Sequence, residues 1–439
     1  MKKLYFLAFL LFSLYAKTFS QGAFTSGNLV VFKVGNGTDT LSTAGFAVNI
    51  DEYSTAGSFV KSHPLPTSIS GANKRIIGSG SATSDGQITR SVDKKFLVVA
   101  GYDTIPDPNR AFITNSTSIN VNRVVGIFSA DGSLDATTAL SDAYNANLFR
   151  AAVSNNGTDI WLAGTGISPS AGVRYTTKGA TTTTQLSTSV TNIRMVNIFN
   201  NQLYCTTGSG AFKAISAVGT NLPTTAGETI TVLPGFPNTT ASGPDPYAFS
   251  IKPGTANIAY VADARSKANG GGVQRWEFDG NNWNLKYTLD SGLTTGLRNL
   301  VVNWDTPTPT IYAITGDSYV KNMPGNKIVS LVDTDSTTQF SIIATADANF
   351  MFRGIAFAPE PAISLTTYTF TGNGNWDVAA NWLNNIIPPS ALPASSAIII
   401  DNIIGGQCIL NVSQTISAGA SLTVMTGKNL VVPGILTIQ

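Results

Sequence analysis

Charged residues are scarce in this chain of 439 residues, since Asp, Glu, Lys and Arg together make up 12% of it. Soluble domains average about 25% charged residues. A sequence so poor in charge and so rich in Gly, Ser, Thr and Asn favours short strands joined by tight turns over long helices faced with Glu and Lys. The 43% of hydrophobic residues is too high for a disordered chain. An all-β globular protein is therefore expected.

Histidine and cysteine are almost missing, with one His and two Cys in the whole chain. This excludes a His/Cys zinc cage, a haem or iron–sulfur centre and a disulfide-stapled scaffold. Cys205 and Cys408 fall in different candidate domains, so two buried thiols are expected. We expect no metal site and no cofactor. The runs at 333–336 and 279–282 have oxygen ligands for calcium, but neither completes a ligand loop, and both are typical of hairpin turns.

The first twenty residues have the pattern of a signal peptide. Lys2 and Lys3 precede an apolar run over residues 4–16, and small residues follow, so cleavage between Ser20 and Gln21 is expected. The run is too short to span a bilayer. Removing residues 1–20 takes three of the 27 basic residues and leaves 24 against 25 acidic ones. A nearly neutral mature chain has no electrostatic footprint for nucleic acid, and no later segment has the pattern of a transmembrane span, so neither a nucleic-acid partner nor membrane insertion is expected. We expect a secreted or surface-exposed protein.

An internal repeat predicts the fold of residues 21–362. Arg90, Arg150, Arg194, Arg298 and Arg353 each open an apolar strand, and all but the last are followed by a polar turn and a second apolar strand. With Ala248 in the fourth repeat, these positions are spaced by 44 to 60 residues, close to the about 40–50 residues of a propeller blade. Hairpins around Asp131-Gly132 and Asp279-Gly280 supply outer strands. We predict a monomeric six-bladed β-propeller.

The last blade of this propeller lacks strands that the N-terminus can supply. The strand at 352–357 stops at Pro359 without a partner, while residues 28–34, 46–50 and 58–60 are strand-like and have no Arg-led strand. Closing the circle in this way hides the sheet edges. Seven blades are expected instead if residues 44–80 hold a complete blade.

Several segments resemble a group of secreted bacterial β-propeller proteins of unassigned function. They are residues 271–276, 283–289, 296–298 and 352–359, together with the opening 27–35 and 51–53. The resemblance spans nearly all of residues 24–362. It implies export, a propeller fold and frequent additional C-terminal modules, but no reaction or ligand.

Residues 363–439 have a different pattern, with short strands at rung-like intervals punctuated by Gly419, Gly427 and Gly434. This part resembles the beginning of a β-solenoid of bacterial surface proteins, in which rungs stack on one another. Trp376 and Trp382 precede the rungs. They are expected to cap the first rung, and the alternative is stacking on a carbohydrate ring.

The repeated arginines are the candidate ligand-binding residues. If the first strand of each blade lines the channel, the five arginines form an interrupted ring near one mouth. Asp103, Asp263 and Asp317, near the ends of second strands, are expected at the same level. In one interpretation the guanidiniums bridge neighbouring blades; in the other they bind an acidic glycan or a carboxylate-bearing peptide. Ala248 interrupts the ring and is the place where a pocket is expected to open.

The sequence gives little support for catalysis. His63 precedes a proline at the end of a strand, where a packing or surface role is expected, and no catalytic residue is assigned. We therefore predict a non-enzymatic exported propeller that binds a glycan or an extracellular protein. The alternatives are a glycan-active hydrolase or lyase with acidic residues at the channel mouth, and a purely structural surface or matrix protein.

Overall fold

A computed structural model describes residues 21–109, 112–237, 243–361 and 366–439. The expected signal peptide, residues 1–20, lies outside the described residues. The chain divides into two compact units, the first of which ends at Pro361. No helix among the described residues is long and apolar enough to cross a membrane.

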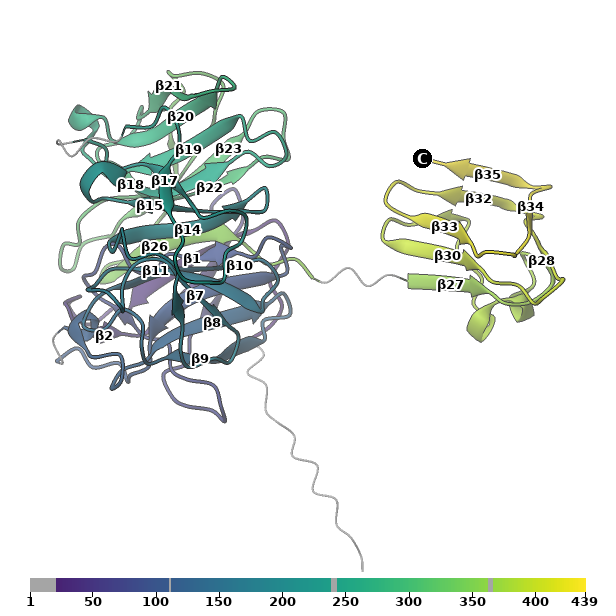
Figure 1. Cartoon of the computed structure of the whole chain (residues 1–439), viewed down its shortest axis with the longest axis horizontal. Helices are drawn as coiled ribbons and strands as arrows, with labels where there is room; N and C mark the ends of the chain where they lie inside the picture. Colours follow the sequence, from purple (N-terminus) through teal and green to yellow (C-terminus); the bar gives the residue numbers. More distant parts are fainter. Residues whose placement is uncertain (1–20, 110–111, 238–242, 362–365) are drawn as a thin grey trace, which may run out of the picture. The chain divides into compact units, whose positions relative to one another are not determined.

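The first unit is a six-bladed β-propeller, as predicted (Figure 1). Each blade is a four-stranded antiparallel sheet, and we number the blades in chain order. From the innermost strand outward, blade one contains β26 (Phe350–Phe357), β1 (Leu29–Gly35), β3 (Val48–Tyr53) and β4 (Phe59–Pro64); blade two, β6 (Thr89–Arg90), β7 (Phe96–Tyr102), β8 (Arg123–Ser129) and β9 (Leu134–Leu140); blade three, β10 (Phe149–Ser154), β11 (Asp159–Gly164), β12 (Arg174–Thr177) and β13 (Thr184–Gln185); blade four, β14 (Ile193–Phe199), β15 (Gln202–Thr207), β16 (Ile215–Val218) and β17 (Ile230–Val232); blade five, β18 (Pro246–Ile251), β19 (Ile258–Asp263), β20 (Gly272–Phe278) and β21 (Trp283–Leu289); blade six, β22 (Leu297–Asn303), β23 (Thr310–Thr315), β24 (Lys327–Val332) and β25 (Ser341–Thr345).

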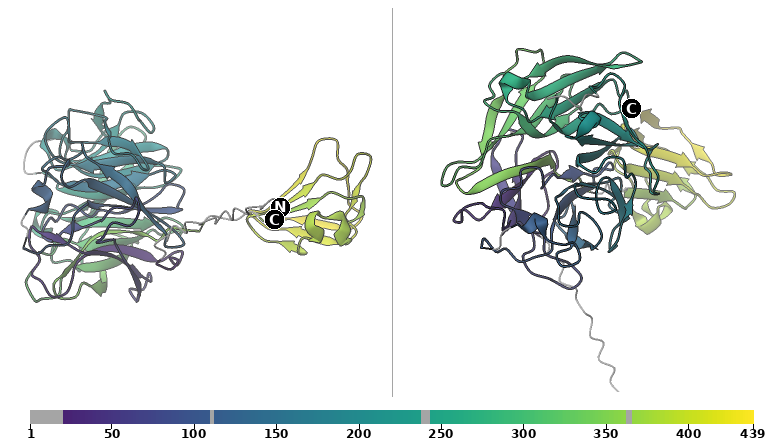
Figure 2. Two further views of the ribbon diagram at one scale, coloured as in Figure 1. Left: turned by 90° about the horizontal axis from the view of Figure 1, so that it is seen from below. Right: turned by 60° about the vertical axis from the view of Figure 1, so that its left-hand side comes forward.

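The six innermost strands close a circle around the channel. Each of β6, β10, β14, β18, β22 and β26 contacts the next, and β26 contacts β6 again. Figure 2 shows the sheets grouped around this centre. Because each inner strand packs between neighbouring sheets, apolar residues are favoured on both of its faces, and all six residues of β10 and of β18 are buried.

Blade one joins the two ends of the propeller. Its innermost strand β26 pairs antiparallel with β1, from Leu29 opposite Phe357 to Gly35 opposite Phe350. The N-terminal strands therefore complete the blade that the sequence left without partners. Residues 44–80 do not form a seventh blade, because β3 and β4 belong to blade one and only the short β2 (Gly45–Phe46) and β5 (Gly78–Ser79) pair separately.

The predicted hairpins are confirmed. β8 and β9 are joined around Asp131-Gly132, and β20 and β21 around Asp279-Gly280. Both glycines have positive φ, 82° and 105°, which a residue with a Cβ rarely adopts. The helical elements of the described residues are five single 3-10 turns: η1 (Ile113–Asn115), η2 (Gly210–Phe212), η3 (Lys267–Asn269), η4 (Ala379–Asn381) and η5 (Leu383–Asn385).

The second unit is a short parallel β-solenoid of three rungs (Figure 1). Three parallel sheets each contain one strand from every rung: β27 (Thr366–Phe370), β30 (Ser396–Ile400) and β33 (Ser421–Val424); β28 (Gly374–Asn375), β31 (Cys408–Ile409) and β34 (Leu430–Val431); β29 (Ala391–Leu392), β32 (Ser413–Ile416) and β35 (Ile435–Ile438). Phe370, Ile398 and Cys408 fill the interior between the sheets.

We predict that the closure of blade one carries much of the propeller's stability. Leu29 of β1 is fully buried in one apolar cluster with Phe352 and Ile355 of β26. Leu29→Ala should lower the free energy of unfolding by about 3 kcal/mol, because it leaves a cavity where the two ends of the propeller meet. Leu285→Ala, at a 48% exposed position of β21, is the matched control and should change it by less than about 0.5 kcal/mol. Denaturant unfolding of both variants tests this, and equal effects would contradict it.

Candidate functional site at a mouth of the propeller

A β-bulge near the start of the inner strands positions the arginine side chains. The strand register shifts at Arg150, at Arg194 and at Arg298, and again at Arg353 in β26. A bulge leaves one residue out of the ladder and re-aims its side chain. In blade five the same place belongs to Tyr247, because Pro246 pairs with Asp263 and Phe249 with Val261. The interruption of the ring is therefore Tyr247, one residue before the predicted Ala248, which is itself buried.

Arg90 does not join the other four arginines. Its neighbour Thr89 donates a hydrogen bond of 2.8 Å to the carbonyl of Ala152, and Gln87 N donates one of 3.1 Å to the carbonyl of Arg150. Arg90 therefore lies three residues further along the inner strand than Arg150, about 10 Å at the usual rise. By the same count Gln87 occupies the ring position of blade two, and Asp85, two residues before it, contributes a carboxylate. The sequence reasoning missed Asp85.

Arg90 lies instead at the opposite mouth of the channel. There it lines a cavity of about 300 Å³ together with Met195, Phe249 and Leu300 from inner strands of three other blades. Its Nη1 donates a hydrogen bond of 2.8 Å to Glu360 Oε1. This cavity has mostly apolar walls, and Arg90 supplies a cation at its edge.

Three ring arginines donate hydrogen bonds to backbone carbonyls outside their own inner strand. Arg150 Nη1 donates to the carbonyl of Ile193 at 3.0 Å, and Arg194 Nη1 donates to that of Pro246 at 3.3 Å. Arg353 Nη2 donates to the carbonyl of Gly80 at 2.8 Å. Arg194 also forms an ion pair with Asp245. These contacts agree with the bridging interpretation for Arg150, Arg194 and Arg353.

Arg298 is the exception among the four. The corresponding carbonyl ahead of it, that of Phe352, already accepts a hydrogen bond of 2.8 Å from Asn326 Nδ2. Arg298 forms no hydrogen bond within the described residues, and its Nε is buried without a partner. Its guanidinium lies 5.9 Å from the centre of the Tyr247 ring, whose other neighbour is Arg194 at 4.2 Å. Arg298 is partly exposed, and its two terminal nitrogens, unlike Nε, are not among the buried unpartnered atoms, so they can reach a ligand.

The buried carboxylate of Asp85 completes the ring. Burial raises the pKa of Asp85 to about 7, against the opposing effect of Arg353 and Arg150. Burial likewise lowers the pKa of the Arg353 guanidinium to about 10. Asn299 of blade six donates a hydrogen bond to Gln87, which comes from blade two. Since these blades are not neighbours, this bond crosses the channel at the level of the ring.

Each of the three predicted aspartates forms its ion pair with a cation other than a ring arginine. Asp103 forms an ion pair with Arg75 at 2.7 Å, Asp263 one with Arg265 at 2.8 Å, and Asp317 one with Lys327 at 3.1 Å. Each therefore neutralises a local cation at a strand end. Asp263 nevertheless lies beside the ring, since it pairs with Pro246 and its Oδ2 accepts a hydrogen bond from the N–H of Asp245, the ion-pair partner of Arg194.

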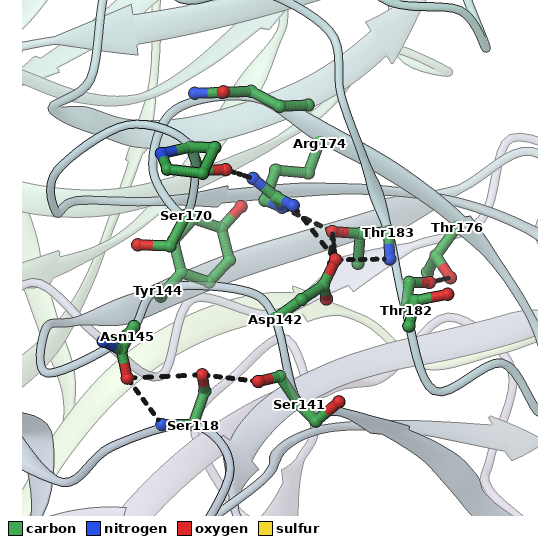
Figure 3. Close-up of polar contacts among 12 residues, drawn as sticks. Ser118, Ser141, Asp142, Tyr144, Asn145, Ser170, Arg174, Thr176, Thr182 and Thr183 are labelled. Carbon is green, nitrogen blue, oxygen red and sulfur yellow. Dashed lines mark hydrogen bonds and ion pairs between the residues drawn. The ribbon is translucent and has the colours of Figure 1, made fainter.

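Two arginines elsewhere in the propeller form several hydrogen bonds each, in contrast to Arg298. Figure 3 shows Arg174 held by Asp142, with Thr183 bonded to the same carboxylate. Arg123, fully buried, donates to the carbonyls of Val121, Ser116 and Tyr144. Both guanidiniums act as structural links.

The remaining candidates have packing roles. Trp376 and Trp382 are 1% and 2% exposed and pack edge to face, so neither offers a face to a sugar ring. The carbohydrate-stacking alternative is therefore wrong for both. His63 is buried and stacks on Phe24 at 4.0 Å. Cys205 and Cys408 are free and buried, as expected.

The two runs with oxygen ligands for calcium form other contacts. Asp279 Oδ1 accepts hydrogen bonds from the backbone N–H groups of Asn281 and Asn282, as expected for a hairpin turn. Asp333 accepts hydrogen bonds from Arg275 Nη1 at 2.6 Å and from the Tyr287 hydroxyl at 2.9 Å. Among the described residues no group of three His, Cys, Asp or Glu is placed to hold a metal ion.

The different partners of Arg150 and Arg298 predict different effects on stability. Arg150→Ala leaves the carbonyl of Ile193 and the side chain of Asn192 without their donor. The free energy of unfolding should fall by about 1–3 kcal/mol. Arg298→Ala removes no hydrogen bond and should change it by less than about 0.5 kcal/mol. Urea unfolding compares the two variants, and an equal loss would show that Arg298 is also a structural link.

No protein-family model matches this chain, and no curated protein does. Solved structures similar to it include TolB from Acinetobacter baumannii, with a TM-score of 0.46 and 9% identity over 77% of this chain and 69% of that one. The GH74 xyloglucanase from Xanthomonas campestris has a TM-score of 0.35 and 12% identity over 75% and 43% of the two chains. Apo AztD from Citrobacter koseri has a TM-score of 0.31 and 11% identity over 75% and 97%. The propeller assignment rests on the strand pairing, and no ligand is inferred from these proteins.

Proposed function

We propose that this chain is an exported, non-enzymatic β-propeller that binds a glycan or an extracellular protein through an acidic group of that partner. The observation that carries the proposal is Arg298, a guanidinium in the ring without a hydrogen bond from the described residues and with a buried, unpartnered Nε. Leaving a charged donor unsatisfied in this way costs free energy in the unbound protein. A carboxylate bound there supplies the missing acceptor.

The surroundings of Arg298 suit an acidic ligand. A guanidinium binds a carboxylate through two parallel N–H···O bonds, which fixes orientation as well as charge. Tyr247 lies between Arg298 and Arg194 and offers an aromatic ring beside the charged group. Arg353 adds a second positive charge next to Arg298. An acidic sugar or an acidic side chain of a peptide fits this combination.

The alternative of a glycan-active enzyme needs two nearby carboxylates in an open cleft, one of them with a raised pKa. Asp85 has the raised pKa, but it is 4% exposed and the charged groups that act on it are arginines. This arrangement favours binding over hydrolysis. The third alternative, a purely structural protein, predicts that none of the ligands in the experiment below binds saturably.

Export is a part of the proposal that can be tested separately. Residues 1–20 have the charge and apolar pattern of a signal peptide. The full chain expressed in a bacterium should be recovered outside the cytoplasm with Gln21 as its first residue, as read by N-terminal sequencing. Recovery in the cytoplasm with residues 1–20 still attached would contradict export.

The binding test uses residues 21–439 and matched acidic and neutral ligands. Trigalacturonate and a triglutamate peptide should bind saturably, whereas trigalactose and a triglutamine peptide should not. Arg298→Ala should weaken binding about 10- to 100-fold, as expected for a lost charged hydrogen bond. Arg90→Ala, at the opposite mouth, is the matched control and should leave the dissociation constant unchanged. Calorimetry measures all of these, and unchanged binding by Arg298→Ala would overturn the site.

A further inference from the structure

We propose that the arginine mouth takes up its acidic ligand together with one proton, which is bound by the carboxylate of Asp85. The inference rests on the proposed function and adds how the occupancy of that site responds to pH. The proton comes from solvent and forms an O–H bond on Asp85, and no other bond is made or broken.

Asp85 is a carboxylate with an incomplete set of partners. It is 4% exposed, and its Oδ2 is buried and accepts no hydrogen bond from the described residues. Arg353 and Arg150, which are 6% and 7% exposed, each have a buried Nε without a partner in the same ring. An ionised buried carboxylate normally uses such donors. The ring therefore leaves one carboxylate oxygen and two guanidinium Nε atoms buried without hydrogen bonds, and a proton on Asp85 removes the negative charge that is costly to bury there.

The groups that face Asp85 come from every element around it. Arg353 approaches from β26 and Arg150 from β10, and both favour the ionised form. Tyr102 of β7 is the neutral neighbour, and the backbone N–H groups of Ser79 and of Asp85 itself also favour ionisation. Burial acts in the opposite direction and is the largest effect, so that the pKa lies at about 7 in the unbound protein.

A bound carboxylate shifts this balance through Arg353. Arg353 is the charged neighbour that Asp85 shares with Arg298, since its own pKa responds to both groups. A ligand anion beside Arg298 and Arg353 compensates the positive charge that holds Asp85 ionised, and it adds a negative charge to the same mouth. The protonated form of Asp85 is then favoured. By linkage, a ligand that promotes protonation must itself bind more tightly when the proton is present.

The sign and size of the pH effect follow from this linkage. At pH 6 most unbound chains already carry the proton on Asp85, whereas at pH 8 the proton must be taken up from solvent when the ligand binds. The affinity should therefore fall about five- to tenfold between pH 6 and pH 8, approaching tenfold per pH unit between the unbound and bound pKa values. The carboxyl groups of trigalacturonate and triglutamate stay ionised throughout this range, and the α-amino group of triglutamate, which titrates near pH 8, is acetylated, so that the ligand does not supply the effect.

The experiment measures the binding of trigalacturonate and triglutamate to residues 21–439 at pH 6, 7 and 8. Asp85→Asn carries a neutral amide of similar shape and should bind at all three pH values with the affinity that the unaltered chain has at pH 6. Calorimetry at pH 7.5 in phosphate and in Tris should show up to one proton taken up per ligand by the unaltered chain and none by Asp85→Asn.

The outcomes separate this inference from the proposed function. Binding that is independent of pH in the unaltered chain, or a pH dependence that persists in Asp85→Asn, overturns proton uptake by Asp85 and leaves the binding site intact. Absence of binding to both ligands at pH 6 overturns the proposed site as well. If Asp85→Asn does not fold, the proton count of the unaltered chain decides, and zero protons per ligand overturns the inference.

Discussion

The hydrogen bonds between β26 and β1 join the last strand of the propeller to its first, and the other five blades depend on this pairing. An inner strand is stable only when it has a blade on either side, because both of its faces are apolar and must be buried. Without β1, the sheet edge of β26 would be open to other chains. Closure therefore holds the six inner strands side by side around the channel. The arginine mouth exists because the arginine-bearing ends of these strands then meet at one end of the channel.

The ring itself is a compromise between bridging and binding. A guanidinium with five donors suits the place where one blade ends and the next begins, since carbonyl groups at the strand starts need partners. Arg150 and Arg353 fill this role and are almost completely buried. In blade six the carbonyl of Phe352 accepts a hydrogen bond from Asn326 Nδ2, and Arg298 does not donate to it. This single exchange leaves Arg298 without its bridge.

Much of the fold could be predicted from the sequence, and the site only in part. The spacing of apolar strands and turns predicts six blades and their closure, because burial between blades writes the same pattern in every repeat. This spacing does not fix the register of each inner strand to within one residue. Arg90 directly precedes its turn, whereas Arg150 stands four residues before Ser154, and this count of residues to the turn would have separated them. Asp85 carries no sequence signal, since its importance comes from burial beside Arg353, which lies 268 residues later in the chain.

The exit of the chain from the propeller has a mechanical consequence. The strand β26 begins at Phe350, carries Arg353 at the arginine mouth and ends at Phe357, after which Glu360 is held by Arg90 at the opposite mouth. A force that pulls the chain at Glu360 away from the arginine mouth acts along the axis of β26. The hydrogen bonds to β1 lie across that axis, so the load is shared by the whole ladder at once and does not open it one bond at a time. The same strand that closes the propeller is thus oriented to resist pulling.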